Sequence, residues 1–111
     1  MYLAGPYRAP TPIGVAWNVA RAEAAGRAIT ALGHRVIVPH SLSKPLDPDN
    51  RRGDQWWLDM TMDLLERCDA IVTMPDLWQS EGSVAEVARA ADLGMQHFTL
   101  RDILGEVEWV E

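Results

Sequence analysis

The chain is poor in cysteine and has no long apolar run. Its only cysteine, Cys68, excludes an internal disulfide bond and a cysteine-based zinc cluster, which suits a reducing compartment. No apolar run approaches the roughly 20 residues of a membrane span, and the opening run MYLAGPY is too short for a signal peptide. These absences predict a cytoplasmic protein that makes no contact with a membrane.

Basic residues are also scarce, because 16 Asp and Glu outnumber 10 Lys and Arg and give a net charge of -6. A negative field repels polyphosphates, so we expect no binding of nucleic acid polymers, although local donors can still hold a small anion. Histidine pairs and carboxylate runs with metal-ligand spacing are missing, and we predict no metal site and no cofactor. Neither G-x-G-x-x-G nor G-x-x-x-x-G-K occurs, which argues against a standard dinucleotide or P-loop site.

The size of the chain fits one globular domain over residues 1–111, with 48% hydrophobic and 23% charged residues. Such a chain is short for an enzyme with an active site of its own. Five tryptophans in so few residues suggest a buried interface between subunits. We therefore expect a homodimer or a larger homo-oligomer.

Short apolar runs alternate with helical patterns along the chain. Runs typical of buried strands lie at residues 1–4, 35–39, 69–74 and 96–100, and residues 107–110 suggest an edge strand. Helical spacing of apolar residues covers 12–32, 57–68 and 84–94, with a brief turn at 103–104. This alternation predicts an α/β fold: a flavodoxin-like, Rossmann-type three-layer sandwich with a four- or five-stranded parallel sheet.

Residues 40–54, HSLSKPLDPDNRRGD, are polar, carry two prolines and show no periodicity. We predict a loop here. A loop of this length is uncommon inside a compact domain unless it has a task such as covering a ligand. A mobile surface excursion is the alternative.

The segments that follow parallel strands meet at the carboxyl edge of the sheet, where ligands bind in such folds. Residues of this edge that offer ligand contacts are Gly5, Tyr7, Arg8, His40, Asp76 and Trp78. Tyr7 and Trp78 present aromatic faces on which a base can stack, or against which a partner subunit can pack. Arg8 is by default a solvated loop residue, and Asp76 after Pro75 also suits a turn.

Glu86 has a sequence context that supports two roles. Ser83 and Glu86 match a capping box, in which Glu86 binds back to the start of its own helix. Gly82 also allows a ligand to approach the positive end of that helix, where Ser80, Ser83 and Arg8 can donate to a phosphate or a sugar. Glu86 would then be a carboxylate beside the ligand. The local pattern leaves cap and catalyst open.

Three segments resemble the nucleoside 2-deoxyribosyltransferase superfamily, in the same order along the chain. They are Tyr2-Leu3-Ala4-Gly5-Pro6-Tyr7-Arg8, Cys68-Asp69-Ala70-Ile71-Val72 and Ser80-x-Gly82-Ser83-x-x-Glu86-x-x-x-Ala90-x-x-x-Gly94. The resemblance covers nearly the whole chain except residues 40–54 and the C-terminal tail. It points to the small bacterial and phage branch, whose relatives include deoxynucleoside monophosphate N-glycosidases.

The resemblance implies an enzyme, an N-glycosidase or a nucleoside deoxyribosyltransferase. In the family, the glutamate at the position of Glu86 attacks the anomeric carbon of a ribosyl or deoxyribosyl group, and water or a second base resolves the resulting ester. The segment matching residues 80–83 holds the 5' end or its phosphate, and the position matching Arg8 can assist. Asp76 lies where a contact to the base is expected.

One departure from the family concerns the second helix, where members commonly carry an aspartate that orients the nucleophile or the sugar. Thr61 stands at that position, and Asp59 and Asp63 are two residues away, roughly 200° around a helix. Either Thr61 or Asp59 takes over this role, or the chemistry has weakened. The alternatives to an enzyme are a non-catalytic nucleotide-binding module of the same fold and a structural subunit.

Overall fold

The computed structural model describes residues 1–105, apart from the side chain of Lys44. Its centre is a parallel sheet of three strands in the order β1-β2-β3. The strands are β1 (Tyr2–Ala4), β2 (Ala70–Thr73) and β3 (Gln96–Thr99). The helices of the described part are α1 (Pro12–Ala31), α2 (His40–Leu46), α3 (Asp54–Glu66), α4 (Glu81–Asp92) and α5 (Leu100–Leu104), with a 3-10 helix η1 (Leu77–Gln79) before α4.

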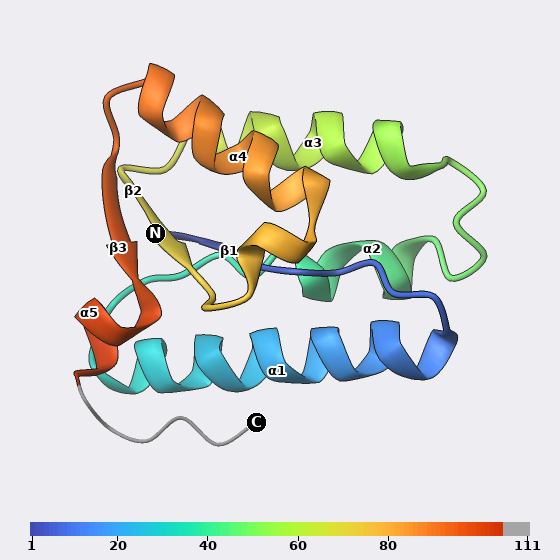
Figure 1. Cartoon of the computed structure of the whole chain (residues 1–111), viewed down its shortest axis with the longest axis horizontal. Helices are drawn as coiled ribbons and strands as arrows, with labels where there is room; N and C mark the ends of the chain where they lie inside the picture. The colour runs from blue at the N-terminus through green and yellow to red at the C-terminus, as the bar shows by residue number, and fades with distance from the viewer. Residues whose placement is uncertain (106–111) are drawn as a thin grey trace.

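Helices lie on both sides of the sheet, with α1 on one side and α3 and α4 on the other (Figure 1). Each side has its own apolar core, because neighbouring residues of a strand point to opposite faces. The core on the α1 side contains Leu3, Ala22, Ala25, Ile29, Val72, Met74 and Leu100. The core on the side of α3 and α4 contains Tyr2, Ala4, Leu65, Ile71 and Ala90. The fold is therefore a mixed α/β arrangement.

The prediction of a four- or five-stranded, flavodoxin-like sheet is wrong for the described residues, because residues 35–39 form no strand. Only Ile37 bridges to β1: its N–H donates to the carbonyl of Met1 (2.8 Å), and the N–H of Leu3 donates to the carbonyl of Ile37 (3.0 Å). The next N–H on this side of the segment would belong to Pro39, which has none. The pairing therefore stops after one bridge.

The first helix begins and ends where its sequence predicts. Thr11 is the N-cap of α1, and its hydroxyl accepts a hydrogen bond from the N–H of Gly14 (3.1 Å). Pro12 occupies the first helical position, where a missing N–H does no harm. Gly33 follows the helix with a φ of +92°, a left-handed conformation that favours glycine.

The prediction of a loop over residues 40–54 is wrong for its first half, which forms α2. Contacts to other elements hold this short helix: the His40 ring bonds to backbone carbonyls after β1, and the Ser41 hydroxyl donates to Glu23 of α1 (2.8 Å). The second half is a fixed turn, because the Asp47 carboxylate accepts from the N–H of Arg51 (3.0 Å) and from the Trp57 indole (2.9 Å). Tertiary contacts of this kind leave no periodic signal in a sequence.

The predicted capping box at the start of α4 is wrong. The N-cap is Ser80, whose hydroxyl accepts from the N–H of Ser83 (3.2 Å). The helix therefore begins three residues earlier than expected. Ser83, Glu86 and Ala90 of α4 are buried, whereas its apolar residues Val84, Ala88 and Ala91 are exposed.

The C-terminal part of the described chain contains β3 and α5, as the sequence predicts. Thr99 and Asp102 form a capping box at the start of α5, with bonds of 2.8 and 3.1 Å between the backbone of each and the side chain of the other. The predicted edge strand at residues 107–110 lies outside the described residues. No helix of the described chain is long and apolar enough to cross a membrane.

Candidate functional site

A buried pair of polar side chains joins the first strand to α4. Glu86 of α4 is only 7% exposed and faces the sheet, where the Tyr2 hydroxyl donates a hydrogen bond to its Oε2. Tyr2 itself is fully buried, although it carries a hydroxyl. A buried phenol needs a hydrogen-bond partner, and Glu86 supplies it.

Burial controls the ionisation of this pair. Burial raises the pKa of Glu86 to about 7, while hydrogen bonding from Tyr2 and from Thr61 acts in the opposite direction. The pKa of Tyr2 is raised as well, first by burial and then by the neighbouring carboxylate, so the phenol remains a proton donor. Glu86 is therefore a carboxyl group that gains or loses a proton near neutral pH, which is typical of groups with a catalytic task.

Of the two residues proposed to replace the family aspartate, only Thr61 lies beside Glu86. Its side chain acts to lower the pKa of both Glu86 and Tyr2 by hydrogen bonding, and its Oγ1 also lies 3.1 Å from the carbonyl oxygen of Leu58 within α3. Asp59 is exposed on the outer side of α3 and accepts a bond from Gln55 (2.8 Å). The site therefore has a neutral hydroxyl where a second carboxylate was expected.

The carbonyl of Gly5, at the end of β1, is a meeting point for two predicted site residues. It accepts from the Ser83 hydroxyl (2.7 Å) and from His40 Nε2 (2.9 Å), which also donates to the carbonyl of Pro6 (3.2 Å). A side chain on Gly5 would approach Met74 Cγ to 2.4 Å, so only glycine fits here. The donors of Ser83 and His40 thus hold the carboxyl edge together and are not free for a ligand.

His40 is neutral in this position. Two carbonyls face Nε2, which must carry the ring proton. Burial lowers the pKa of the imidazole, with the two carbonyl bonds acting against that shift. Nδ1 is then an acceptor, and it is buried without a hydrogen-bond partner among residues 1–105.

Asp76 is held by a residue that the sequence did not indicate. Arg21 of α1 binds it through two bonds, from Nη1 to Oδ2 (2.6 Å) and from Nη2 to Oδ1 (3.1 Å). Arg21 is only 7% exposed and lies next to the apolar positions of α1 that face the sheet. The sequence signal that could have revealed Arg21 is a cationic residue next to the apolar positions of a helix. Both carboxylate oxygens of Asp76 are therefore engaged by Arg21.

The remaining predicted residues, Arg8, Tyr7, Trp78 and Gly82, lie on the segments after β1 and β2 and in the first turn of α4. Arg8 forms an ion pair with Asp54 at the start of α3 and lies over the Tyr7 ring, 5.5 Å from its centre. Trp78 on η1 is 70% exposed. A side chain on Gly82 would make only ordinary contacts, the nearest being Leu58 Cδ1 at 3.8 Å, so close packing does not require glycine there.

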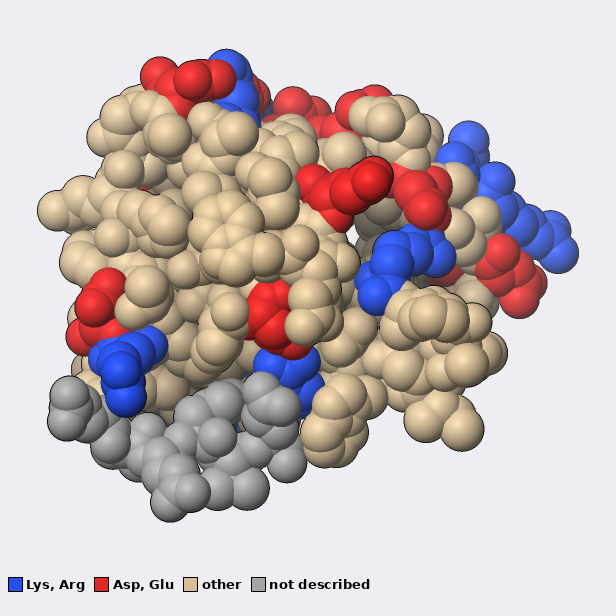
Figure 2. Space-filling model, viewed as in Figure 1, with Lys and Arg blue, Asp and Glu red and all other residues tan. Residues whose placement is uncertain are grey.

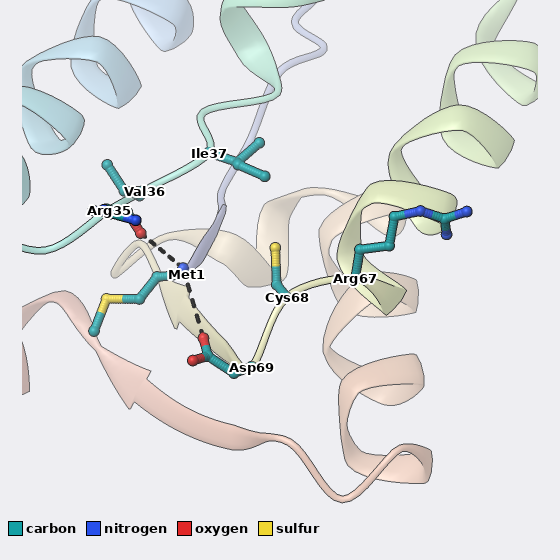
Figure 3. Close-up of a pocket in the computed structure, with 7 residues that line it drawn as sticks. All are labelled: Met1, Arg35, Val36, Ile37, Arg67, Cys68 and Asp69. Carbon is teal, nitrogen blue, oxygen red and sulfur yellow. Dashed lines mark hydrogen bonds and ion pairs between the residues drawn. The ribbon is translucent and has the colours of Figure 1, made fainter.

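The hollows of the described surface lie in several places. Figure 2 shows one between the start of α4 and the segment that follows β1, with acidic and basic side chains around it. A cavity of about 390 Å³ lies at the opposite edge of the sheet, where the Met1 ammonium donates to the carbonyl of Arg35 (2.8 Å) and pairs with Asp69 (3.9 Å) (Figure 3). A third hollow, of about 470 Å³, lies beside α1. Only the first is at the predicted ligand edge.

Comparison with protein families gives one match. The family model described as a domain of unknown function (DUF7768) matches residues 1–99, which include every residue of the candidate site. Neither the curated proteins nor the solved structures give a match to the chain. No comparison links it to the nucleoside 2-deoxyribosyltransferase superfamily, so that resemblance stays a prediction.

Proposed function

The chain belongs to the family described as a domain of unknown function, DUF7768, and we propose from its site that it cleaves or exchanges the N-glycosidic bond of a nucleoside or nucleoside 5'-monophosphate. The observation that carries the proposal is the buried pair of Glu86 and Tyr2. Its support is chemical: a carboxylate with a pKa of about 7, positioned by a phenol, suits attack on an anomeric carbon.

In the proposed reaction, ionised Glu86 is the nucleophile. Tyr2 binds Oε2, which leaves Oε1 to form the bond to the anomeric carbon while the bond to the base breaks. The electron pair of that bond leaves with the base, and a glycosyl ester remains on Glu86. Water then attacks the anomeric carbon, and the ester bond breaks with its electron pair returning to the Glu86 carboxylate. The proton that the water loses balances the proton that the departed base takes up. In a transfer reaction, a second base attacks in place of water. The carboxylate also stabilises the positive charge that develops on the sugar.

One feature instead favours a non-catalytic nucleotide-binding module of the same architecture. Glu86 is only 7% exposed, which limits the access of a substrate to its carboxylate. In this second candidate function, the polar edge of the sheet would bind a nucleotide without cleaving it. The two candidates differ in whether a base is released.

The experiment is a survey of ribonucleosides and 2'-deoxyribonucleosides, each with and without a 5'-phosphate, with free base measured by chromatography. We expect base release from at least one compound, and a loss of about three orders of magnitude or more in Glu86→Gln. Asp63→Asn is the matched control, because it makes the same change of carboxylate to amide on the exposed side of α3. Binding without release from any compound would support the module, and release that survives in Glu86→Gln would exclude this nucleophile.

A further inference from the structure

The ion pair of Arg8 and Asp54 connects the segment after β1 to the start of α3. The backbone under Arg8 is fixed, because the Asn18 amide donates to the carbonyls of Tyr7 (3.2 Å) and Arg8 (3.4 Å). The guanidinium lies over the Tyr7 ring. Its side chain is nevertheless 50% exposed, so its partner can be exchanged.

Such an exchange has a low energetic cost. An exposed ion pair contributes a factor of up to about five to an equilibrium constant. Asp54 also keeps other support when Arg8 leaves, because the Asn50 amide donates to the same Oδ1 (2.7 Å). Asp54 is the first residue of α3, where the positive end of the helix favours an anion. Its carboxylate is therefore not left as an unsupported charge.

Of the donors that the sequence assigned to a phosphate, Arg8 is the one that carries a charge. The Ser83 hydroxyl donates to the carbonyl of Gly5, whereas the Ser80 hydroxyl only accepts a bond, from the N–H of Ser83. Glu81 in the first turn of α4 adds a negative charge at the end of the helix that would otherwise attract an anion. An anionic group that enters this edge of the sheet is thus directed to Arg8, in the segment that follows β1.

We propose that Asp54 competes with the 5'-phosphate of a nucleoside monophosphate for the Arg8 guanidinium, which it holds in the empty site and releases when the phosphate binds. A phosphate carries a charge of about -1.5 to -2 at pH 7, and a guanidinium binds it through two parallel bonds. The phosphate therefore displaces a single carboxylate. An uncharged nucleoside cannot, so Arg8 favours monophosphates over nucleosides, and Asp54 reduces that preference by competing for the guanidinium. The inference rests on the proposed nucleotide site, but not on turnover.

The test measures binding by calorimetry in a Glu86→Gln background, so that no ligand is consumed. The probes are the four common 2'-deoxynucleoside 5'-monophosphates and the four matching nucleosides. Asp54→Asn removes the competing carboxylate and should tighten binding of a monophosphate about three- to fivefold, without changing binding of its nucleoside. Asp49→Asn is the control, because it changes the net charge equally at an exposed residue that pairs with Arg51 (3.8 Å). It should change neither affinity.

Arg8→Gln should weaken binding of the monophosphate to the level of the nucleoside, whether residue 54 is Asp or Asn. A thermal melt of each variant establishes that it is folded. The inference is overturned if Asp54→Asn leaves the monophosphate affinity unchanged, if it tightens both ligand types equally, or if no monophosphate binds either protein. The proposed cleavage is tested separately: if the expected binding pattern occurs but the wild-type protein releases no base, the cleavage proposal is wrong and the inference about Asp54 stands.

Discussion

The buried carboxyl of Glu86 predicts how the stability of the protein depends on pH. Its pKa is about 7 in the folded chain, against 4.5 for an ordinary glutamate. Between these values, the folded protein keeps a proton that the unfolded chain has lost. The stabilisation is fully present below pH 4.5 and is lost as the pH rises through about 7, because ionisation of the buried group then opposes folding.

The magnitude follows from the difference between the two pKa values. The difference of 2.5 (7 minus 4.5), at 1.36 kcal/mol for each pKa unit, gives about 3 kcal/mol. Glu86→Gln replaces the carboxyl by a neutral amide of the same shape, which can still accept from Tyr2. The difference in free energy of unfolding between the variant and the wild type should therefore shift in favour of the variant by about 3 kcal/mol from pH 4.5 to pH 8.5.

Urea unfolding at pH 4.5 and pH 8.5 measures this quantity, with Asp63→Asn as the control. The lowered pKa of His40 adds a slope of the opposite sign in the acid range, but all three proteins share it and it cancels in the comparison. If the free energies of unfolding of the wild type and Glu86→Gln changed with pH in parallel, the conclusion that Glu86 is a buried ionisable group would be wrong.

Three further predictions test the surroundings of Glu86. Tyr2→Phe removes a bond that lowers the pKa of Glu86, so the rise of base release with pH, centred near 7 in the wild type, should move to higher pH in a pH-rate profile. Gly5→Ala forces a methyl group to 2.4 Å from Met74 Cγ and should lower the free energy of unfolding in urea by about 1–3 kcal/mol. Ser80→Ala should lower it by about 1 kcal/mol in the same assay, because Ser80 is the N-cap of α4.

The parts of the fold that could be predicted are those with a local cause. Residues 70–73 form a short apolar run beside a polar residue, which predicts a strand. The ends of α1 are indicated by Thr11 and Pro12 at its start and by Gly33 after its last turn. Residues 35–39 form no strand because Pro39 has no N–H that could continue the pairing with β1. That effect is also local, and an apolar run with a proline at its end could have been recognised as a weak strand.

The parts that could not be predicted depend on contacts between distant residues. Arg21 and Asp76 are 55 positions apart, and His40 is 35 positions from the carbonyl that it binds. The start of α4 was misplaced for a related reason, since Ser80 and Ser83 are both good capping residues. The choice between them follows from the bond that Ser83 makes to Gly5, across the sheet.

Thr61 affects how readily Glu86 of the candidate site ionises. A second carboxylate at its position would place a like charge beside a glutamate that is only 7% exposed, and like charges raise the pKa of a neighbouring carboxyl. Glu86 would then remain protonated above pH 7 and could not attack as an anion. The Thr61 hydroxyl acts in the other direction and lowers the pKa of Glu86. In so buried a position, a neutral hydroxyl therefore suits a glutamate nucleophile better than the aspartate that the family resemblance led us to expect.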